Sequence, residues 1–328
     1  MLTTNASPVA ALDRQCEQRT APGYLAAVLE TVDYRVVVFH RGRALMDGGN
    51  LAYLDPECID PAYRDLAGDV LPLGGTHVYL GKVGPGQTHR LAAATDIVLL
   101  SLPLSALPED ASELSWAPLG NVFAGYRDVA QHLNAVDAQV FVEAQAVAQW
   151  HGSHVHCPRC GSSTESQSAG WMRRCTADGS QHFPRTDPAA IVAIVGADDR
   201  ILLANNYAWN ENRYSTVAGF VEAGESAEQA AVREIAEEVG VHLHSLTYVS
   251  SQAWPFPRSL MFGFIGFTND TEATPDRSEV RDARWFEREE LQAAVLSGDA
   301  VISHKASIAR SLIELWYGGP ILEPGEQA

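Results

Sequence analysis

A loop that leads directly into an acidic helix constrains this chain more than any other feature. The stretch at residues 219–241 contains Ser226 with Gln229 three positions later, which is the spacing of a capping box. A helix is therefore expected to begin at Ser226, and Gly240 is a natural residue for its end. The opposite ends of one short helix are thus fixed by local chemistry alone.

Three carboxylates lie on one face of that predicted helix. Glu234, Glu237 and Glu238 follow each other at i, i+3 and i+4, so their side chains are neighbours and repel one another. Hard carboxylate oxygens suit Mg²⁺ or Mn²⁺, and phosphate oxygens commonly complete the shell of such ions. The predicted ligand is a phosphate ester or anhydride. The opposite face carries apolar residues that can pack on a sheet: Ala231, Ile235 and Val239.

The alternative is that this acidic face is simply solvated, which is the usual fate of a run of charges. A solvated face has no need of Gly219 and Gly224, which lack a Cβ and let a backbone approach a ligand closely. The glycines therefore favour a binding site over a solvated helix.

The fixed residues of this stretch resemble a complete Nudix box. They are Gly219, Glu225, Arg233, Glu234, Ile235, Glu237, Glu238, Gly240 and Val241. The resemblance implies an α/β/α Nudix fold and hydrolysis of a nucleoside diphosphate linked to another group. It also implies that Glu234, Glu237 and Glu238 bind the metal and act in catalysis, with Glu238 coupling the metal to the attacking water. Structural roles in the box are implied for Gly219, Gly224, Glu225, Arg233 and Gly240.

Length and charge limit the other possibilities. A chain of 328 residues is long enough for two domains with sizeable cores. Its net charge of −18 opposes broad, sequence-independent binding to nucleic acid, which needs a basic surface. We see no apolar run of the ~20 residues that span a bilayer and no secretory signal. No membrane association and a cytoplasmic location are therefore expected.

The N-terminal part of the sequence predicts a mixed, mainly β domain over residues 1–120. Residues 34–39 and 44–46 form an expected hairpin that turns at Gly42, and 76–80 and 96–102 are further strands. Apolar residues at helical spacing predict one or two helices in a connector over 121–150. No catalytic cluster is visible here, so scaffolding, dimerisation or shaping of the rim of the site is the expected role.

Cysteines mark a zinc-ribbon-like segment over residues 151–187. Cys157 and Cys160 form a Cys-x₂-Cys knuckle, Cys175 follows, and Asp178 occupies the place of the last expected cysteine. Three interpretations stay open. Asp178 binds a structural Zn²⁺ through oxygen, or a histidine supplies the fourth ligand, either His182 or His156, or the ribbon has lost its metal. This segment is the least acidic part of the chain, so any polyanion is expected to bind here.

The predicted C-terminal domain spans residues 188–318 and completes an α+β fold, with a tail at 319–328. Its expected strands are 189–195, 200–205, 217–221, 246–252, 260–267 and 281–286, and its closing helices are 287–297 and 307–316.

An aromatic stretch lies between two of those strands, at residues 251–259. Trp254 and Phe256 are flanked by prolines, which predicts a rigid shelf, or else a surface loop whose aromatic rings merely pack. The stretch is similar to the Ser-Gln-Pro-Trp-Pro-Phe-Pro-x-Ser motif of the NADH pyrophosphatases, the NudC-type branch of the Nudix family. Ala253 replaces the first proline of that motif and loosens the loop. The resemblance covers about residues 157–313.

The branch implies further site residues. Glu279 is expected to supply a further acid on a loop over the metal site. The alternative is that it is a solvated carboxylate on a surface loop. Phe220 and Trp254 are the surfaces on which nicotinamide can stack. The other implied substrate contacts are Gln252, Ser259, Phe183, Ile191 and Ala309.

These residues predict cleavage of NADH or NAD⁺ to a nicotinamide mononucleotide and AMP. Removal of the NAD cap from RNA is an implied second activity, and a homodimer is implied by the branch. Three rival hypotheses remain. They are a Nudix hydrolase for ADP-ribose or a dinucleoside polyphosphate, a non-catalytic regulator that senses nucleotides, and an RNA-binding module based on the ribbon.

Overall fold

A computed structural model describes residues 12–31, 33–64, 75–85, 91, 94–107 and 114–326 of the chain. The first eleven and the last two residues, which belong to the predicted N-terminal domain and tail, lie outside these ranges. The chain forms two compact units, one of residues 6–185 and one that contains residues 186–328. No helix in the described ranges is both long and apolar enough to cross a bilayer. The finer predicted boundaries within each unit stay predictions.

The first unit is built on a mixed sheet with the order β1-β5-β6-β2-β3-β4, in which β7 also pairs with β3. Its strands are β1 (Leu12–Asp13), β2 (Tyr34–His40), β3 (Arg43–Asp47), β4 (Asn50–Leu51), β5 (Thr76–Val83), β6 (Thr95–Ser101) and β7 (Val122–Gly125). Its helices are α1 (Tyr24–Leu29), α2 (Pro61–Arg64), α3 (Tyr126–Val129) and α4 (Ala135–Ser153).

Local sequence explains the main elements of this unit. The hairpin of β2 and β3 turns at Arg41 and Gly42, both of which have a positive φ, as the sequence predicts for a turn at Gly42. The side chain of Asn134 accepts hydrogen bonds from two backbone amides at the start of α4, each at 3.0 Å. Phe141 of α4 then packs on Phe39 of β2, with ring centroids 5.1 Å apart. The predicted mainly β character of this part is confirmed, and where one or two helices are expected after it the structure has two, α3 and α4.

The ribbon belongs to the same unit. Its three strands have the order β10-β9-β8. They are β8 (Thr164–Gln167), β9 (Met172–Cys175) and β10 (Gln181–His182). Trp171 donates a hydrogen bond from Nε1 to the backbone oxygen of Tyr79, at 2.7 Å. A Cβ on Gly170 would lie 2.7 Å from a methyl carbon of Val78, so this turn rests directly on β5. The ribbon is thereby anchored to the N-terminal sheet.

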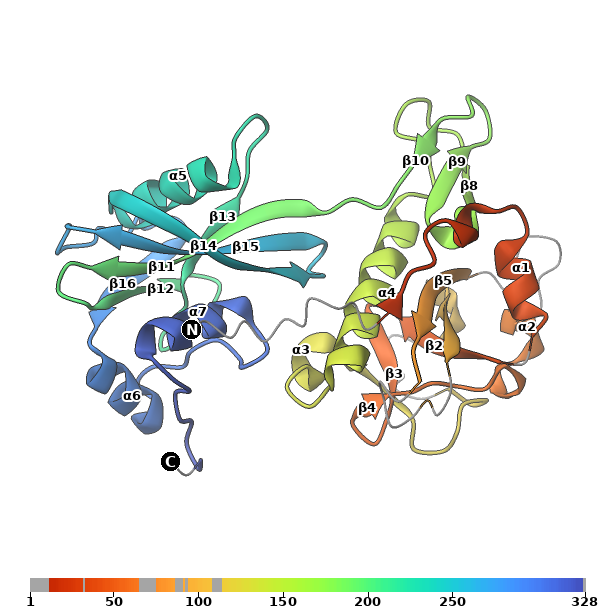
Figure 1. The fold of residues 1–328 in the computed structure, drawn as a ribbon, viewed down its shortest axis with the longest axis horizontal. Coiled ribbons are helices and arrows are strands. Elements are labelled where there is room, and N and C mark those ends of the chain that lie inside the picture. Colours follow the sequence, from red (N-terminus) through yellow and green to blue (C-terminus); the bar gives the residue numbers. More distant parts are fainter. Residues whose placement is uncertain are drawn as a thin grey trace. The chain divides into compact units, whose positions relative to one another are not determined.

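The second unit is an α/β/α sandwich. Its sheet has the order β14-β15-β11-β12-β16, and β13 pairs with β11. The strands are β11 (Asp187–Gly196), β12 (Ile201–Asn206), β13 (Val217–Phe220), β14 (Leu243–Trp254), β15 (Ser259–Thr268) and β16 (Val280–Phe286). The helices are α5 (Ala227–Val239), α6 (Arg288–Ser297) and α7 (Ile308–Tyr317). Figure 1 shows α5 on one side of this sheet and α6 and α7 on the other.

Alternation along the central strand β11 produces the two apolar layers. Ala190, Val192 and Ile194 pack with the buried stripe of α5, whereas Ile191 and Ala193 pack with α6 and α7. Such burial on both faces explains why β11 reads as a continuous apolar run. The predicted α+β class, with a C-terminal α/β/α sandwich, is confirmed.

Candidate active site

The ends of α5 are fixed by the residues that the sequence singles out. Ser226 donates from its backbone amide to Oε1 of Gln229 at 2.8 Å, and the amide of Gln229 donates to Oγ of Ser226 at 3.2 Å. Gly240 ends the helix with a φ of 66°. The capping box and its helix are therefore confirmed. The predicted apolar stripe is buried: Ala231, Ile235 and Val239.

Gly219 and Gly224 are needed for two different reasons. A Cβ on Gly219 would lie 1.9 Å from the carboxyl carbon of Glu234, so the carboxylate of Glu234 rests against the bare backbone of β13. Gly224 has open space around it, but its φ is 96°, which other residues rarely adopt. The first glycine makes room for an acid, and the second allows the loop to turn.

Arg233 ties the loop to the helix through almost every donor of its guanidinium. It holds Glu225 with two bonds, from Nε at 2.8 Å and from Nη2 at 2.9 Å. Nη2 also donates to the backbone oxygen of Phe220 at 2.9 Å. Nη1 lies 2.9 Å from Oε1 of Glu234 and 3.0 Å from Oε2 of Glu237. One arginine thus positions two of the predicted metal-binding acids.

Burial and neighbouring charges raise the pKa of two acids on this face, Glu234 and Glu238. Burial, followed by the charges of Glu234 and Glu279, raises the pKa of Glu238 to about 8. Burial and the charges of Glu237 and Glu279 also raise the pKa of Glu234, although Arg233 opposes the shift. The side chain of Glu237 is 62% exposed and lies at the rim. Glu279 is therefore close enough to act on the same carboxylates, as the sequence anticipates.

Asp276 is an acid of this site that the sequence analysis missed. Its amide donates to the backbone oxygen of Glu238 at 3.0 Å, and its charge contributes to the raised pKa of Glu238. A hydrogen bond from the hydroxyl of Ser278 is the main reason that the pKa of Asp276 is lowered to about 2. Its carboxylate also accepts from the amides of Glu279 and Val280, at 3.1 Å and 2.8 Å. Asp276 therefore shapes the loop that carries Glu279. Its position three residues before another acid is the only signal in the sequence.

The donor set of this face fits a divalent cation. Hard carboxylate oxygens are carried by α5 and by the loop at Glu279, and the raised pKa values of Glu234 and Glu238 reflect burial and negative potential that a cation would neutralise. The Nη1 atom of Arg233 forms ion pairs with both Glu234 and Glu237. Within the described ranges, one group of acidic, cysteine or histidine side chains has all its ligand atoms within 4.8 Å of one another. That group lies in the ribbon and not on this acidic face.

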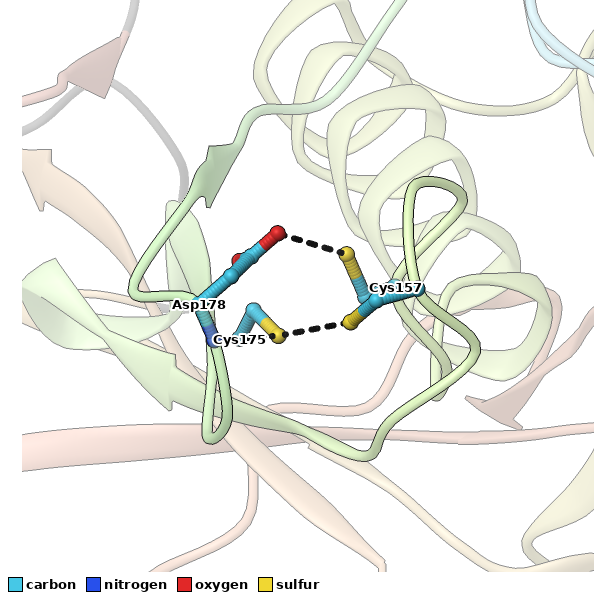
Figure 2. Close-up of side chains that lie close together, drawn as sticks. Cys157, Cys175 and Asp178 are labelled. Carbon is cyan, nitrogen blue, oxygen red and sulfur yellow. Dashed lines mark hydrogen bonds between the residues drawn. The ribbon is translucent and has the colours of Figure 1, made fainter.

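That second group brings together the three ribbon cysteines and Asp178. Cys160 and Cys175 have their sulfur atoms 3.5 Å apart, and Oδ2 of Asp178 lies 4.0 Å from the sulfur of Cys157. Figure 2 shows the side chains of Cys157, Cys175 and Asp178 pointing into one small space. The structure therefore places Asp178, rather than either histidine, with the cysteines.

Ser180 orients Asp178 for this position. Its amide and its hydroxyl donate to Oδ1 of Asp178 at 2.8 Å and 2.5 Å, which leaves Oδ2 facing Cys157. These bonds lower the pKa of Asp178 to about 2. The hydroxyl of Ser180 also lies 3.2 Å from Nε2 of His182, so that histidine reaches the cluster through the serine. The donors, three sulfurs and one carboxylate oxygen, suit a tetrahedral zinc ion.

Comparison with known proteins agrees with both sites. The family model of the NUDIX domain matches residues 185–308, and that of the NADH pyrophosphatase zinc ribbon domain matches residues 153–183. The chain is 35% identical over 248 residues to the NAD-capped RNA hydrolase NudC of Mycobacterium tuberculosis (strain ATCC 25618 / H37Rv), covering 73% of this chain and 74% of that protein. The chain belongs to the NudC-type branch of the Nudix family.

Two further relatives cover less of the chain. The NAD-capped RNA hydrolase NudC of Stutzerimonas stutzeri (strain A1501) is 39% identical over 196 residues, which are 59% of this chain and 68% of that protein. The NAD-capped RNA hydrolase NUDT12 of Macaca fascicularis is 34% identical over 196 residues, which are 56% of this chain and 42% of that protein. These comparisons confirm the family that the sequence motifs indicate.

Two aromatic residues of this Nudix unit differ in their surroundings. Phe220, at the end of β13, is 54% exposed beside the acidic face. Trp254 ends β14 and is half-buried, with its ring centroid 5.2 Å from that of Phe256. The predicted aromatic shelf therefore spans the connection between β14 and β15, and its contact with substrate stays a prediction.

The polar residues of the NudC-type motif have structural partners. Gln252 donates from Nε2 to the backbone oxygen of Ala306 at 2.8 Å and accepts from the amide of Ile308 at 2.7 Å. Both ends of its side-chain amide thus join β14 to the start of α7. Ser259 is buried at the start of β15. Their predicted contacts with ribose or phosphate stay predictions.

The remaining predicted pocket residues are distributed over both units. Ile191 and Ala309 are buried in the same apolar layer, between β11 and α7, so they determine how α7 seats on the sheet. Phe183 belongs to the other unit, where its side chain is 46% exposed. The structure therefore brings together the acids and Phe220, and their joint action with these three residues remains a prediction.

Proposed function

We propose that this protein is a metal-dependent hydrolase that cleaves the pyrophosphate of NADH and NAD⁺ to a nicotinamide mononucleotide and AMP. We further propose that it removes the NAD cap from RNA. The observation that carries the proposal is the folded Nudix box, whose acids Glu234, Glu237 and Glu238 interact electrostatically with one another and with Glu279, beside the exposed residue Phe220. The names of the three relatives, all NAD-capped RNA hydrolases, support the choice of substrate.

Each residue has a distinct task in this mechanism. Glu234, Glu237, Glu238 and Glu279 would hold Mg²⁺ or Mn²⁺, which supplies Lewis acidity toward the phosphate oxygens and favours ionised carboxylates. Arg233 fixes the directions of Glu234 and Glu237. Glu238 is the proposed acceptor of the proton from the attacking water, because it is the most buried of the box acids. Phe220 offers a flat surface for an aromatic base.

Product analysis tests this proposal directly. The protein is incubated with NADH and, separately, with NAD-capped RNA in Mg²⁺ or Mn²⁺, and the released mononucleotides are identified. We expect AMP and a nicotinamide mononucleotide from NADH, and RNA with a 5′ monophosphate from the capped transcript. A faster reaction with ADP-ribose at equal concentration would instead favour the rival hydrolase, and no turnover with any of these substrates would favour a non-catalytic sensor.

A pair of variants on one helix isolates the catalytic acids. Glu238→Gln removes the proposed proton acceptor and should lower kcat by at least a hundredfold. Glu228→Gln makes the same chemical change in the exposed first turn of α5, away from the acidic face, and should leave kcat within twofold. Unchanged turnover by Glu238→Gln would remove this residue from the mechanism.

We also propose that the ribbon holds a structural zinc ion through Cys157, Cys160, Cys175 and Asp178. The closeness of their four ligand atoms and the hydrogen bonds from Ser180 support this set over His182 and His156. A homodimer, implied by the branch, and a cytoplasmic location, expected from the sequence, complete the proposal. Light scattering of the purified protein tests the first, and fractionation of cells tests the second.

A further inference from the structure

A second surface adjoins the acidic face, formed by the loop that follows β12. The amide of Tyr207 donates to the backbone oxygen of Glu279 at 2.9 Å, so this loop is joined to the loop that carries the fourth acid. Arg281, two residues after Glu279, donates from Nη2 to the backbone oxygen of Tyr207 at 3.2 Å. The two loops therefore lie side by side, next to the acids but outside the Nudix box.

Two pairs of an aromatic ring and a guanidinium group occur on this surface. The guanidinium carbon of Arg281 lies 5.2 Å from the ring centroid of Tyr207, and that of Arg213 lies 5.0 Å from the ring centroid of Trp209. The side chain of Tyr207 is 46% exposed. Such pairs combine a flat stacking face with a delocalised positive charge. We name the four residues Tyr207, Trp209, Arg213 and Arg281 the stacking surface.

The charge of Arg281 is not neutralised within the part of the chain that the structure describes. No ion pair involves it there, and its buried Nη1 atom has no hydrogen-bond partner. Its neighbour Arg277 donates from Nη1 to a neutral acceptor, the backbone oxygen of Arg281, at 2.7 Å. In a chain with a net charge of −18, two arginines without carboxylate partners beside one loop mark a local site for an anion.

We propose that the stacking surface receives the single-stranded nucleotides that follow the NAD cap of an RNA. This inference rests on the proposed function, because it assumes that the cap lies at the acidic face. Single-stranded nucleic acid is bound by aromatic rings that stack on bases and by cations along the phosphate backbone, and the stacking surface provides both. Free NADH ends at its adenosine and has no nucleotide that could reach this surface. The stacking surface therefore distinguishes capped RNA from the free dinucleotide.

Substitution of Tyr207 tests this inference. Tyr207→Ala should lower kcat/KM for NAD-capped RNA by about tenfold, as expected for the loss of one base-stacking ring, while kcat/KM for NADH stays within twofold. Tyr207→Phe retains the ring and should restore the activity on RNA. The matched control is Tyr248→Ala, which removes a ring of similar exposure (53%) from β14 and should affect neither substrate.

The length and salt dependence of the reaction supply independent measurements. The effect of Tyr207→Ala should vanish on a cap that carries no further nucleotide and should appear as nucleotides are added. Arg281→Gln should reduce the slope of log kcat/KM against log salt concentration by about 0.7 on RNA, and leave the slope for NADH unchanged.

Each outcome is decisive. Equal losses on NADH and RNA by Tyr207→Ala, in a variant that melts at the wild-type temperature, would overturn the inference, as would unchanged activity on both. A variant that melts early is replaced by Tyr207→Leu, which keeps the bulk but not the flat ring and should show the same selective loss. A wild-type protein that cleaves neither substrate would overturn the proposed function itself. Cleavage of NADH alone would overturn only the role in RNA binding.

Discussion

At the scale of single residues, the site depends on the absence of one methyl group. The carboxylate of Glu234 occupies the space beside Gly219 in which any other residue would place its Cβ. A glycine in a strand usually weakens the strand, since it adds backbone freedom and buries no side chain. Here the glycine lets the acid turn toward its neighbours, Arg233 and Glu238, without distorting β13.

Gly219→Ala should therefore reduce catalysis more than stability. The new methyl group would displace the Glu234 side chain, and we expect kcat to fall by at least tenfold with little change in the melting temperature. Gly224→Ala is the matched control, because its Cβ meets nothing within 4 Å but its φ of 96° is strained. It should destabilise the protein by about 1–2 kcal/mol and leave kcat nearly unchanged. Equal kcat values for the two variants would show that Glu234 does not need this space.

At the scale of elements, the ribbon shows how a changed ligand can be accommodated. Each knuckle is a tight turn closed by backbone bonds, from Cys157 to Ser162 at 2.7 Å and from Cys175 to Ser180 at 2.9 Å. The second turn therefore keeps its shape with aspartate in place of cysteine. Ser180 orients the carboxylate of Asp178 by donating two hydrogen bonds to it. Hydrogen bonds to a ligand's second atom commonly fix the ligand's direction in this way.

Substitution of Asp178 should change the affinity for zinc in both directions. Asp178→Ala leaves three ligands and should weaken zinc binding by at least tenfold, whereas Asp178→Cys restores a four-cysteine site and should strengthen it. Competition with a chromophoric chelator measures both values. Glu165→Ala, at an exposed position on β8 of the same ribbon, is the control and should have no effect. Wild-type affinity in Asp178→Ala would transfer the fourth position to His182 or His156.

The elements themselves could largely be predicted from the sequence, whereas their contacts could not. The capping box and Gly240 give the bounds of α5 to the residue, because the signals for both ends are local. β14 extends from Leu243 to Trp254, beyond the predicted 246–252, because pairing with β15 continues the strand into the aromatic stretch. No local pattern shows that the amide of Gln252 is occupied by the backbone near α7. That contact depends on residues more than fifty positions away.

At the scale of the whole molecule, the two units have separate apolar cores. The cluster around β2, β5 and β6 lies within residues 6–185, and the two clusters on the faces of the Nudix sheet lie within residues 186–328. The predicted boundary between the ribbon and the Nudix unit, after residue 187, stays a prediction, and the two compact units divide between residues 185 and 186. Two cores without shared residues should unfold in two calorimetric transitions.

Between pH 6.5 and 4 the two transitions should respond to pH in opposite directions. The first unit should lose stability as pH falls, whereas burial raises the pKa of Glu238 to about 8, so protonation of this carboxyl should stabilise the second unit. Burial lowers the pKa of His77 and of His151 to about 4. His151 accepts from Arg173 at Nδ1, 2.9 Å away, and is close to the backbone oxygen of Gly170 at Nε2, so the folded unit holds it neutral. The unfolded chain binds the extra protons first, and stability is therefore lost as pH falls through this window.

Glu143 works in the opposite direction. Burial raises its pKa to about 7 despite its ion pair with Arg14, so protonation of this carboxyl stabilises the folded unit as pH falls. The pKa shifts of the two histidines and of the glutamate are similar in size, so one histidine is offset by the glutamate. The free energy of unfolding of the first unit should therefore fall by on the order of 3 kcal/mol between pH 6.5 and 4. Differential scanning calorimetry should show the transition of the first unit moving to lower temperature as pH falls, while that of the second unit does not move down. His151→Gln should reduce the movement, and two transitions that shift together would mean that the units unfold as one.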